Sequence, residues 1–432
     1  MSPRTARTDS PSSDRPTGRG ASASDGAPRR RAASSDRSSR GTSAGRPSAG
    51  GTGRGGGRSR RAGDAPKPAR PRSRVALWIW MTLTVITILL LMLTGYAGYV
   101  SPMNHSSMWG VLPLAFPLMF WTGVVLFVFE VIWCRRAAVV TALGFLCCAG
   151  PALSYCPLHV VKPSAPEGAP EFTLMTYNVH NFVTMEPLPE GVPNPMMDFV
   201  LDQDLDIVCL QEAYMPVVND NLHLTAEQLD RMHEQYPYCM NYFAGAASNQ
   251  TMLSKYPIEV IHVDPSAFKD IVVTVYRVTL PCDRQVTILN VHLSSLHLSA
   301  MKMDATKLNR DDTSLILNHI RIAAVNRAEQ VNKLMQVIRR YGGPETIVCG
   351  DFNDVSDCFA IRELAGAGFR DAYPQVGFGP MVTYNAEHLY FTIDHILYRG
   401  ALKPLDVYKD KLRASDHYPV LSRFAVTDMT AN

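Results

Sequence analysis

The sequence predicts three membrane-spanning helices followed by one α/β domain, in which layered sheets are flanked by outer helices. Three uncharged apolar runs lie between residues 75 and 156, and each approaches the length that a helix needs to cross a bilayer. Beyond residue 171, short apolar runs typical of strands are interspersed with segments of helical periodicity over about 260 residues. Strands and helices intermixed in this way indicate a single α/β domain.

Residues 1–74 form a polar, basic tail. They contain 18 Lys and Arg against 5 Asp and no Glu, a net charge of +13. Large apolar side chains are almost absent, so the tail cannot offset the entropy of ordering and is predicted to be disordered. We interpret it as a cytoplasmic tail that sets topology; the alternatives are an organellar transit peptide and a nucleic-acid-binding arm.

The predicted spans cover residues 75–100, 108–133 and 137–155. Arginines before the first span, together with Arg135 and Arg136 between the second and third, indicate cytoplasmic ends. We therefore expect a multi-pass integral protein in a lipid bilayer, with its tail in the cytoplasm and its domain on the exoplasmic side (periplasm, cell exterior or lumen). The third run is short and contains Gly and Pro. If it is re-entrant instead, the domain lies in the cytoplasm.

A Pro-rich linker, residues 157–170, precedes a domain predicted over residues 171–427. The domain contains an excess of acid, with 21 basic and 32 acidic residues from Glu171 onward, a net charge of −11. A long helix is predicted from Asn318 to Tyr341 by its apolar spacing. Eight strands are predicted, at residues 172–179, 206–212, 251–258, 271–280, 285–293, 346–352, 391–398 and 418–426.

Polar side chains recur at the ends of these predicted strands. Asp351 and Asn353, for example, follow the buried-looking run at 346–349 and its terminal Gly350. Each one alone has an ordinary explanation, because Asn and Asp are common in turns. Their recurrence predicts one shared site, made by Asn178, Glu212, His292, Asp351, Asn353, Asp394, Asp416 and His417.

These residue types indicate phosphoester hydrolysis. Carboxylates and amide oxygens are ligands that Mg²⁺ prefers, with Mn²⁺ as a second candidate, and such an ion often binds substrate phosphate. Imidazoles can donate to phosphate oxygens or transfer a proton, and an Asp can activate water. The nine cysteines show no zinc-site spacing, and no Gly-rich phosphate loop is present.

Seven ordered segments resemble the endonuclease/exonuclease/phosphatase superfamily, over about residues 171–427. They are TYNVHNF, LQEAY, LSKYPI, LNVHL, GDFND, IDHIL and SDHYPV. The superfamily includes secreted deoxyribonucleases, abasic-site endonucleases, neutral sphingomyelinases and inositol polyphosphate phosphatases. The resemblance implies a four-layer α/β sandwich of two packed mixed sheets, with the active site at one edge.

The resemblance also implies a metal site. Glu212 would be the main Mg²⁺ ligand. Asn178 would contact the metal or the phosphate nearby, and Asp416 would complete the site.

The remaining residues receive catalytic roles from the same resemblance. Asp351 would orient or deprotonate the attacking water, and Asn353 would hold the phosphate. His417 would stabilise the pentavalent transition state, with its tautomer fixed by Asp394. His292 occupies the position that protonates the leaving oxygen in several branches.

Three features depart from the family pattern. Asn249 to Thr251 stand where small and aliphatic residues are more usual. Residues 297–312 form an expanded loop, interpreted as a solvated insertion, with a substrate rim as the alternative. His180 and His297 are extra imidazoles, interpreted as bystanders.

The phosphoester itself stays open between nucleic acid and a phospholipid or sphingolipid headgroup. The charge of −11 argues mildly against a tight nucleic-acid binder, because such proteins usually gather Lys and Arg on one face. Three spans would hold the site near a bilayer, which favours a lipid headgroup but also suits an exported nuclease. A non-catalytic membrane protein that uses the fold for binding is the alternative to an enzyme. No protein partner is predicted.

Overall fold

The computed structural model describes residues 74–189, 191–213, 223–243, 249–264, 268, 271–295, 310–386 and 390–427. Every element below belongs to one compact unit, residues 70–432. The predicted disorder of residues 1–73 lies outside the described residues, as does the predicted insertion from residue 297 to residue 309.

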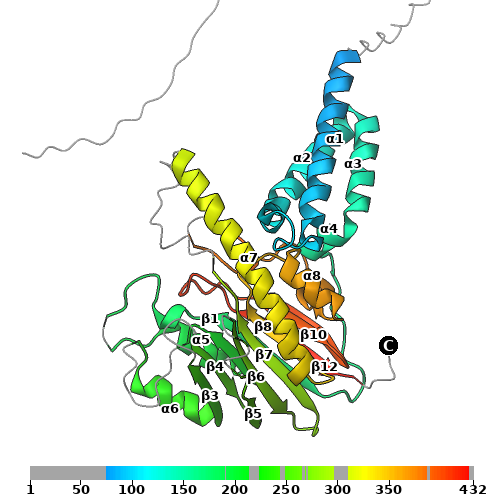
Figure 1. The fold of residues 1–432 in the computed structure, drawn as a ribbon. Helices are drawn as coiled ribbons and strands as arrows, with labels where there is room; N and C mark the ends of the chain where they lie inside the picture. The colour runs from blue at the N-terminus through cyan, green and yellow to red at the C-terminus, as the bar shows by residue number, and fades with distance from the viewer. Residues whose placement is uncertain are drawn as a thin grey trace, which may run out of the picture. The chain divides into compact units, whose positions relative to one another are not determined.

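The N-terminal part of this unit is a bundle of apolar helices (Figure 1). Its elements are α1 (Arg74–Tyr96), η1 (Ala97–Tyr99), η2 (Ser107–Gly110), η3 (Leu112–Ala115), α2 (Phe116–Trp133), α3 (Arg135–Cys147) and α4 (Ala149–Tyr155). Two segments are long and apolar enough to cross a membrane, Arg74–Tyr99 and Leu112–Trp133. They correspond to the first two predicted spans.

The third predicted span differs from a straight helix. Helices α3 and α4 meet at an angle of 75°, as in a broken span or a re-entrant loop. Pro151 lies in the first turn of α4 and lacks the N–H that would continue the hydrogen-bond ladder of α3. Among the described residues, the bundle therefore contains two candidate spans, or three if the bent pair is counted as one.

Glu130 links three helices of the bundle through hydrogen bonds. It lies in α2 and is only 1% exposed. Its two carboxylate oxygens accept hydrogen bonds from the hydroxyls of Thr84 in α1 and Thr141 in α3. A buried carboxyl with hydrogen-bond partners is far less costly than an unpaired one, so this cluster fixes how the three helices pack.

Two six-stranded mixed sheets form the centre of the C-terminal part. The order of the first is β11-β12-β1-β2-β4-β3 and that of the second is β5-β6-β7-β8-β10-β9. Within the part of the chain that the structure describes, β1/β2 and β7/β8 are the pairs that run in parallel. The strands are β1 (Glu171–Asn178), β2 (Ile207–Gln211), β3 (Tyr238–Phe243), β4 (Asn249–Ser254), β5 (Ile258–Ile261), β6 (Val272–Thr279), β7 (Gln285–His292), β8 (Thr346–Asp351), β9 (Arg370–Asp371), β10 (Asp394–Arg399), β11 (Leu402–Lys409) and β12 (Val420–Val426).

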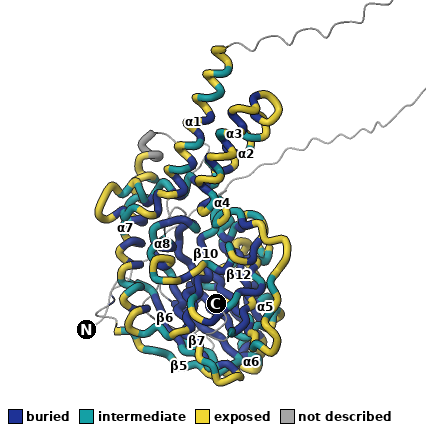
Figure 2. Tube along the Cα trace, turned by 90° about the vertical axis from the view of Figure 1, so that its right-hand side faces the viewer, coloured by how far each residue is buried: buried dark blue, intermediate teal, exposed yellow. Residues whose placement is uncertain are grey.

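Helices cover the outer faces of both sheets, so the layers are helix, sheet, sheet and helix (Figure 1). One apolar core fills the space between the sheets, a second lies under α7 and α8, and a third lies under α5 and α6. Figure 2 shows the strands as the buried centre of the fold. The helical elements are η4 (His180–Phe182), α5 (Pro195–Gln203), α6 (Ala226–Gln235), α7 (Arg310–Tyr341), α8 (Phe359–Gly366) and α9 (Tyr373–Val376). The predicted α/β sandwich of two packed mixed sheets is confirmed.

Eight strands were predicted, and the described residues contain twelve. The four that the sequence did not reveal, β3, β5, β9 and β11, are the outermost strands of the two sheets. Edge strands pair on one side only and are often less apolar, which weakens their sequence signal. The predicted strand at 251–258 is wrong in its bounds, because β4 ends at Ser254 and Pro257 separates it from β5. Helix α7 begins at Arg310, eight residues before the predicted start.

Candidate active site

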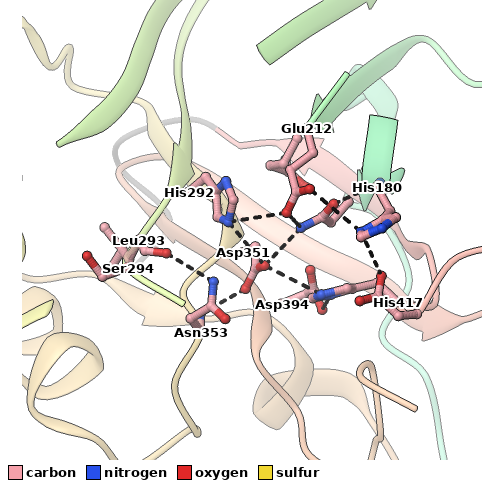
Figure 3. A network of polar contacts seen from close by, with 12 residues as sticks. His180, Glu212, His292, Leu293, Ser294, Asp351, Asn353, Asp394 and His417 are labelled. Atoms are coloured by element: carbon pink, nitrogen blue, oxygen red, sulfur yellow. Dashed lines mark hydrogen bonds and ion pairs between the residues drawn. The ribbon is translucent and has the colours of Figure 1, made fainter. Parts of the chain in front are cut away.

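Strand direction brings the predicted site residues to one end of the two sheets. In the first sheet, β1 and β2 run in parallel and deliver Asn178 and Glu212 to the same edge. In the second, β7 and β8 run in parallel, with His292 in register with Asp351. The antiparallel partner β10 begins at this edge, where Asp394 pairs with Asp351. The carboxyl ends of strands from both sheets therefore converge at one place (Figure 3).

Asp351 lies at the centre of the polar network and is 1% exposed. One carboxylate oxygen, Oδ2, accepts from Asn178 Nδ2 at 3.0 Å, and the other, Oδ1, accepts from the backbone N–H of Asn353 at 2.8 Å. The Nε2 atoms of His292 and His417 lie 3.7 and 3.6 Å from Oδ2. Burial raises the pKa of Asp351 above its usual range although both imidazoles oppose the rise. This carboxyl is therefore a better base than an exposed aspartate.

His417 and Asp394 form a buried imidazole–carboxylate pair. His417 Nδ1 lies 2.9 Å from Asp394 Oδ2, which leaves Nε2 directed toward Asp351. Burial opposes the charge of His417, but the Asp394 and Asp351 carboxylates outweigh it and raise its pKa to about 10. Backbone N–H donation to Thr383 Oγ1 helps to hold Asp394 in place. The Asp394 and Asp351 carboxylates therefore favour the imidazolium form of His417.

Two carboxylates lie on the more open side of the network. Glu212 and Asp416 have side chains 24% and 26% exposed, and both lie near His180 Nδ1, at 3.8 and 3.9 Å. Glu212 Oε1 accepts from Asn178 Nδ2 at 3.0 Å and lies 3.7 Å from His292 Nε2. His180 was interpreted as a bystander near the site, and that role stays a prediction. Its position two residues after Asn178, at the same strand end, accounts for its place beside the two carboxylates.

The backbone is strained where these side chains leave their strands. Glu212 and Asn353 have φ values of 48° and 52°, and the three residues from His180 to Phe182 have 44°, 53° and 61°. Non-glycine residues rarely adopt this left-handed conformation, at a cost of roughly 1 kcal/mol or more each. Such strain concentrates at functional sites, where the surrounding fold holds it in place.

Buried polar groups brace the loop after β8. Arg327, 1% exposed, donates from Nε to Asp354 Oδ2 at 3.0 Å. His395 lies 3.1 Å from the Asp354 carbonyl through Nε2 and 2.8 Å from Asp371 Oδ2 through Nδ1. Asn353 Nδ2 donates to the Leu293 carbonyl at 3.0 Å. His395 in the IDHIL segment thus points away from the network and supports the loop that carries Asn353.

The unusual polar run in β4 has a structural role. Gln250 is 1% exposed; it donates through Nε2 to the Asn290 carbonyl at 3.0 Å and accepts from the Thr274 hydroxyl at 2.7 Å. Gln211 adds a bond to Asn290 Oδ1 at 2.7 Å. These bonds join the two sheets beneath the network, so the departure at Asn249 to Thr251 stiffens the floor under the site.

All eight predicted site residues lie in this network, whereas His297 lies outside the described residues. The donor chemistry fits a hard divalent cation at the open side, because Glu212 and Asp416 offer partly exposed carboxylate oxygens. Asn178 directs Nδ2 at Glu212 and Asp351, and its Oδ1 accepts from the His180 N–H at 3.0 Å. One ligand atom each from Asp351, Asp394 and His417 also lie within 4.8 Å of one another.

Several solved structures of low sequence identity are similar to part of this chain. An endonuclease/exonuclease/phosphatase from Beutenbergia cavernae is 14% identical with a TM-score of 0.42, and the match covers 61% of this chain and 73% of that chain. The 2',3'-cyclic phosphatase ANGEL2 is 16% identical (TM-score 0.41, covering 62% and 99%). The human Nocturnin catalytic domain with bound sulfate is 16% identical (TM-score 0.39, covering 62% and 97%). No curated protein matches the chain.

A family model gives the decisive comparison. The model of the endonuclease/exonuclease/phosphatase family matches residues 175–417, more than half of the chain. The match begins within β1 and ends at His417, so it includes the whole polar network and the strands from β2 to β11. The chain therefore belongs to the endonuclease/exonuclease/phosphatase family, whose members are hydrolytic phosphoesterases and generally use a divalent metal.

Proposed function

We propose that the protein is a membrane-anchored phosphoesterase that hydrolyses a phosphodiester or phosphomonoester by attack of water, assisted by Mg²⁺ or Mn²⁺. The observation that carries the proposal is the convergence of Asp351, the His417–Asp394 pair and the Glu212 carboxylate at one edge of the two sheets. One network thus contains a buried base, Asp351, a positively charged imidazole, His417, and a partly exposed carboxylate, Glu212.

Each group has a role that follows from its surroundings. The raised pKa of Asp351 suits it to orient and deprotonate water. The charged His417, fixed through Nδ1, would stabilise negative charge as it builds on the phosphoryl oxygens. Asn353 uses Nδ2 to bind the Leu293 carbonyl, which fixes its amide beside Asp351 so that it can contact the phosphate. His292, at 3.7 Å from Asp351, would pass a proton to the leaving oxygen.

A divalent cation fits the open side of the network. Glu212 and Asp416 would hold it, and Asn178 would orient Glu212 through its amide. When bound, a divalent cation would supply positive charge that offsets the negative charge of a substrate phosphate. Without such a cation, the carboxylates of Glu212 and Asp416 would repel an anionic substrate.

The exposed apolar surface of the bundle supports membrane anchoring. Trp78 is 70% exposed, Leu118 is 66% exposed and Leu146 is 71% exposed. Large apolar patches of this kind are unfavourable in water and mark contact with lipid or protein. We infer a multi-pass anchor with the N-terminal tail in the cytoplasm and the catalytic part on the exoplasmic side. If protease added to intact cells cleaves a tag on the tail but not the catalytic part, this orientation is wrong.

The test of function is a phosphoester panel with full-length protein in lipid nanodiscs. We expect hydrolysis of at least one substrate with Mg²⁺ or Mn²⁺ and none with a chelator. Asp351→Asn and Glu212→Gln should each lower kcat/KM by roughly 10²–10⁴-fold. The matched control is Asp230→Asn on the exposed face of α6, which should stay within about twofold.

The panel also tests the competing interpretation, a membrane protein that uses the fold for binding only. No turnover of deoxyribonucleic acid, ribonucleic acid, phospholipid, sphingomyelin or a chromogenic diester under any metal condition would favour it. Hydrolysis that is unaffected by Asp351→Asn would instead refute the residue roles while leaving the reaction intact.

A further inference from the structure

The polar network lies next to the start of the second candidate span. Phe116 and Pro117, in the first turn of α2, line one small cavity together with Phe391 and Thr392. Thr392 precedes Asp394 by two residues in the chain. The strand entry that positions the His417 partner therefore packs directly against the bundle.

The chain between the two candidate spans rests on the same edge. Gly98 of η1 lies against the backbone of Asp357, so closely that a Cβ there would overlap the Asp357 carbonyl. The Tyr99 ring packs on the guanidinium of Arg362, with 4.6 Å from Cζ to the ring centroid. Since Asp357 follows Asp351 by six residues, the facing ends of both spans meet the loop that leaves the catalytic strand β8.

This arrangement fixes where a bilayer would lie. The apolar core of a membrane ends where the apolar part of a span ends, and the headgroup layer begins there. The end of α1 and the start of α2 are those points for the two candidate spans. The edge that carries the polar network therefore borders the headgroup layer, whereas the opposite ends of the strands point away from it.

Exposed apolar side chains lie beside the network on the same edge. Val183, Met185 and Leu188, in the loop between η4 and α5, are 43%, 51% and 39% exposed. The backbone N–H of Met185 donates to the Ala414 carbonyl at 3.0 Å, so this loop lies beside the segment that carries His417. Three such residues in a short loop are a surface that water does not favour.

Basic groups occupy the loop between β11 and β12, and an aromatic ring lies in the segment before β10. Lys411 and Arg413 are exposed and lie within six residues of His417. Tyr390 is 57% exposed and lines the cavity at the start of α2 together with Phe391 and Thr392. Exposed Lys and Arg attract anionic lipid headgroups, and Tyr is favoured at membrane interfaces. We call Val183, Met185, Leu188, Tyr390, Lys411 and Arg413 the membrane-facing rim.

We propose that the site acts on a phosphodiester of a membrane lipid, with the membrane-facing rim in contact with the bilayer that holds the substrate. This inference rests on the proposed function and names its substrate class. In the reaction, the oxygen of water forms a new bond to phosphorus while one ester P–O bond breaks. One water proton passes to the base, and the departing alcohol oxygen receives a proton.

Charge and surface chemistry favour lipid over nucleic acid. The sequence from Glu171 onward has a net charge of −11, whereas nucleic-acid binding draws its affinity from many cations against successive phosphates. The rim combines two basic side chains with exposed apolar ones. A bilayer can bind both, because its headgroups attract the basic groups while its apolar core accommodates the apolar side chains.

The first experiment measures contact with the bilayer and does not depend on turnover. Leu188→Trp is introduced into full-length protein in nanodiscs of phosphatidylcholine and phosphatidylglycerol that contain brominated acyl chains. We expect its additional fluorescence, relative to the unsubstituted protein, to be quenched. The matched control is Cys282→Trp, an exposed position on the turn before β7 at the opposite end of the sheet, and it should not be quenched.

The second experiment compares one headgroup in two physical states. Phosphatidylglycerol in the nanodisc is tested against water-soluble glycerophosphoglycerol, which has no acyl chains, and against single-stranded and duplex oligonucleotides. The double variant Met185→Glu and Leu188→Glu should lower turnover of the lipid roughly tenfold. Turnover of the soluble diester should change less than about twofold. In the control variant Cys282→Glu, turnover of the lipid and of the soluble diester should each change less than about twofold.

The outcomes separate the two proposals. Equal quenching at positions 188 and 282, equal loss on lipid and soluble diester, or preferential hydrolysis of oligonucleotides would each overturn the lipid inference while phosphoester hydrolysis stands. Quenching at position 188 without turnover of any substrate would instead refute the proposed function and leave the membrane contact established.

Discussion

Asp357 offers a sharp test of the contact between the bundle and the catalytic loops. Its side chain is 4% exposed and pairs with Arg362. Burial raises the pKa of Asp357 from 3.8 to about 7, although Arg362 and Ser154 of α4 both oppose the rise. The carboxyl is thus more easily ionised in the unfolded chain than in the folded protein.

The sign of the pH effect follows from this difference. Between pH 4 and pH 7 the folded state binds more protons at Asp357 than the unfolded state, so this group makes the protein less stable as pH rises. At pH above 7, the difference between the pKa of Asp357 in the folded and in the unfolded state lowers the free energy of unfolding by on the order of 4 kcal/mol relative to acid pH. Asp357→Asn keeps the shape of the side chain and removes the ionisation, so it should become progressively more stable than the parent across this range.

The assay is thermal unfolding of the full-length protein in nanodiscs at a series of pH values. We expect the Tm of Asp357→Asn minus that of the parent to increase by roughly 5–10 °C between pH 4 and pH 7.5. The control, Asp230→Asn on α6, should show a flat difference because its side chain is exposed. A flat or falling difference for Asp357→Asn would refute the reasoning, since it would mean that the buried carboxyl is ionised throughout.

Three further predictions concern the supports of the network. Arg327→Met should lower the free energy of unfolding by about 3–5 kcal/mol because it leaves Asp354 buried and unpaired, whereas exposed Arg339→Met should change it by less than about 0.5 kcal/mol in denaturant titrations. Gly350→Ala should lower the free energy of unfolding by roughly 2 kcal/mol or more in the same titration, because φ at Gly350 is 141° and a Cβ would overlap a carbonyl of β7. An unchanged denaturation midpoint would contradict this prediction. Asp394→Asn should lower kcat/KM about a hundredfold by releasing His417, measured against Asp371→Asn, whose partner His395 lies outside the network; equal losses would show that only stability changed.

The sequence determined the elements whose signal is local. Central strands such as β7 and β8 are buried on both faces, so their continuous apolar runs were readable, as were the two candidate spans. The polar residues at the strand ends were also readable, because Asn178, Glu212 and Asp351 interrupt strongly apolar runs. Parallel strands carry the residues at their carboxyl ends to the same edge of a sheet. The grouping of the site residues could therefore be predicted from the sequence.

Tertiary structure decided what depends on distant partners. The edge strands were missed because their pairing, more than their composition, makes them strands. His180 comes to lie near both Glu212 and Asp416 only in the folded chain. The side chain of His395, one residue after Asp394, contacts Asp371 instead of the network. The proximity of the catalytic edge to the candidate spans arises from packing of η1 on the loop after β8, between segments more than 250 residues apart in the chain. Contacts of that kind leave no periodic pattern in a sequence, because neither segment carries a local signal of its partner.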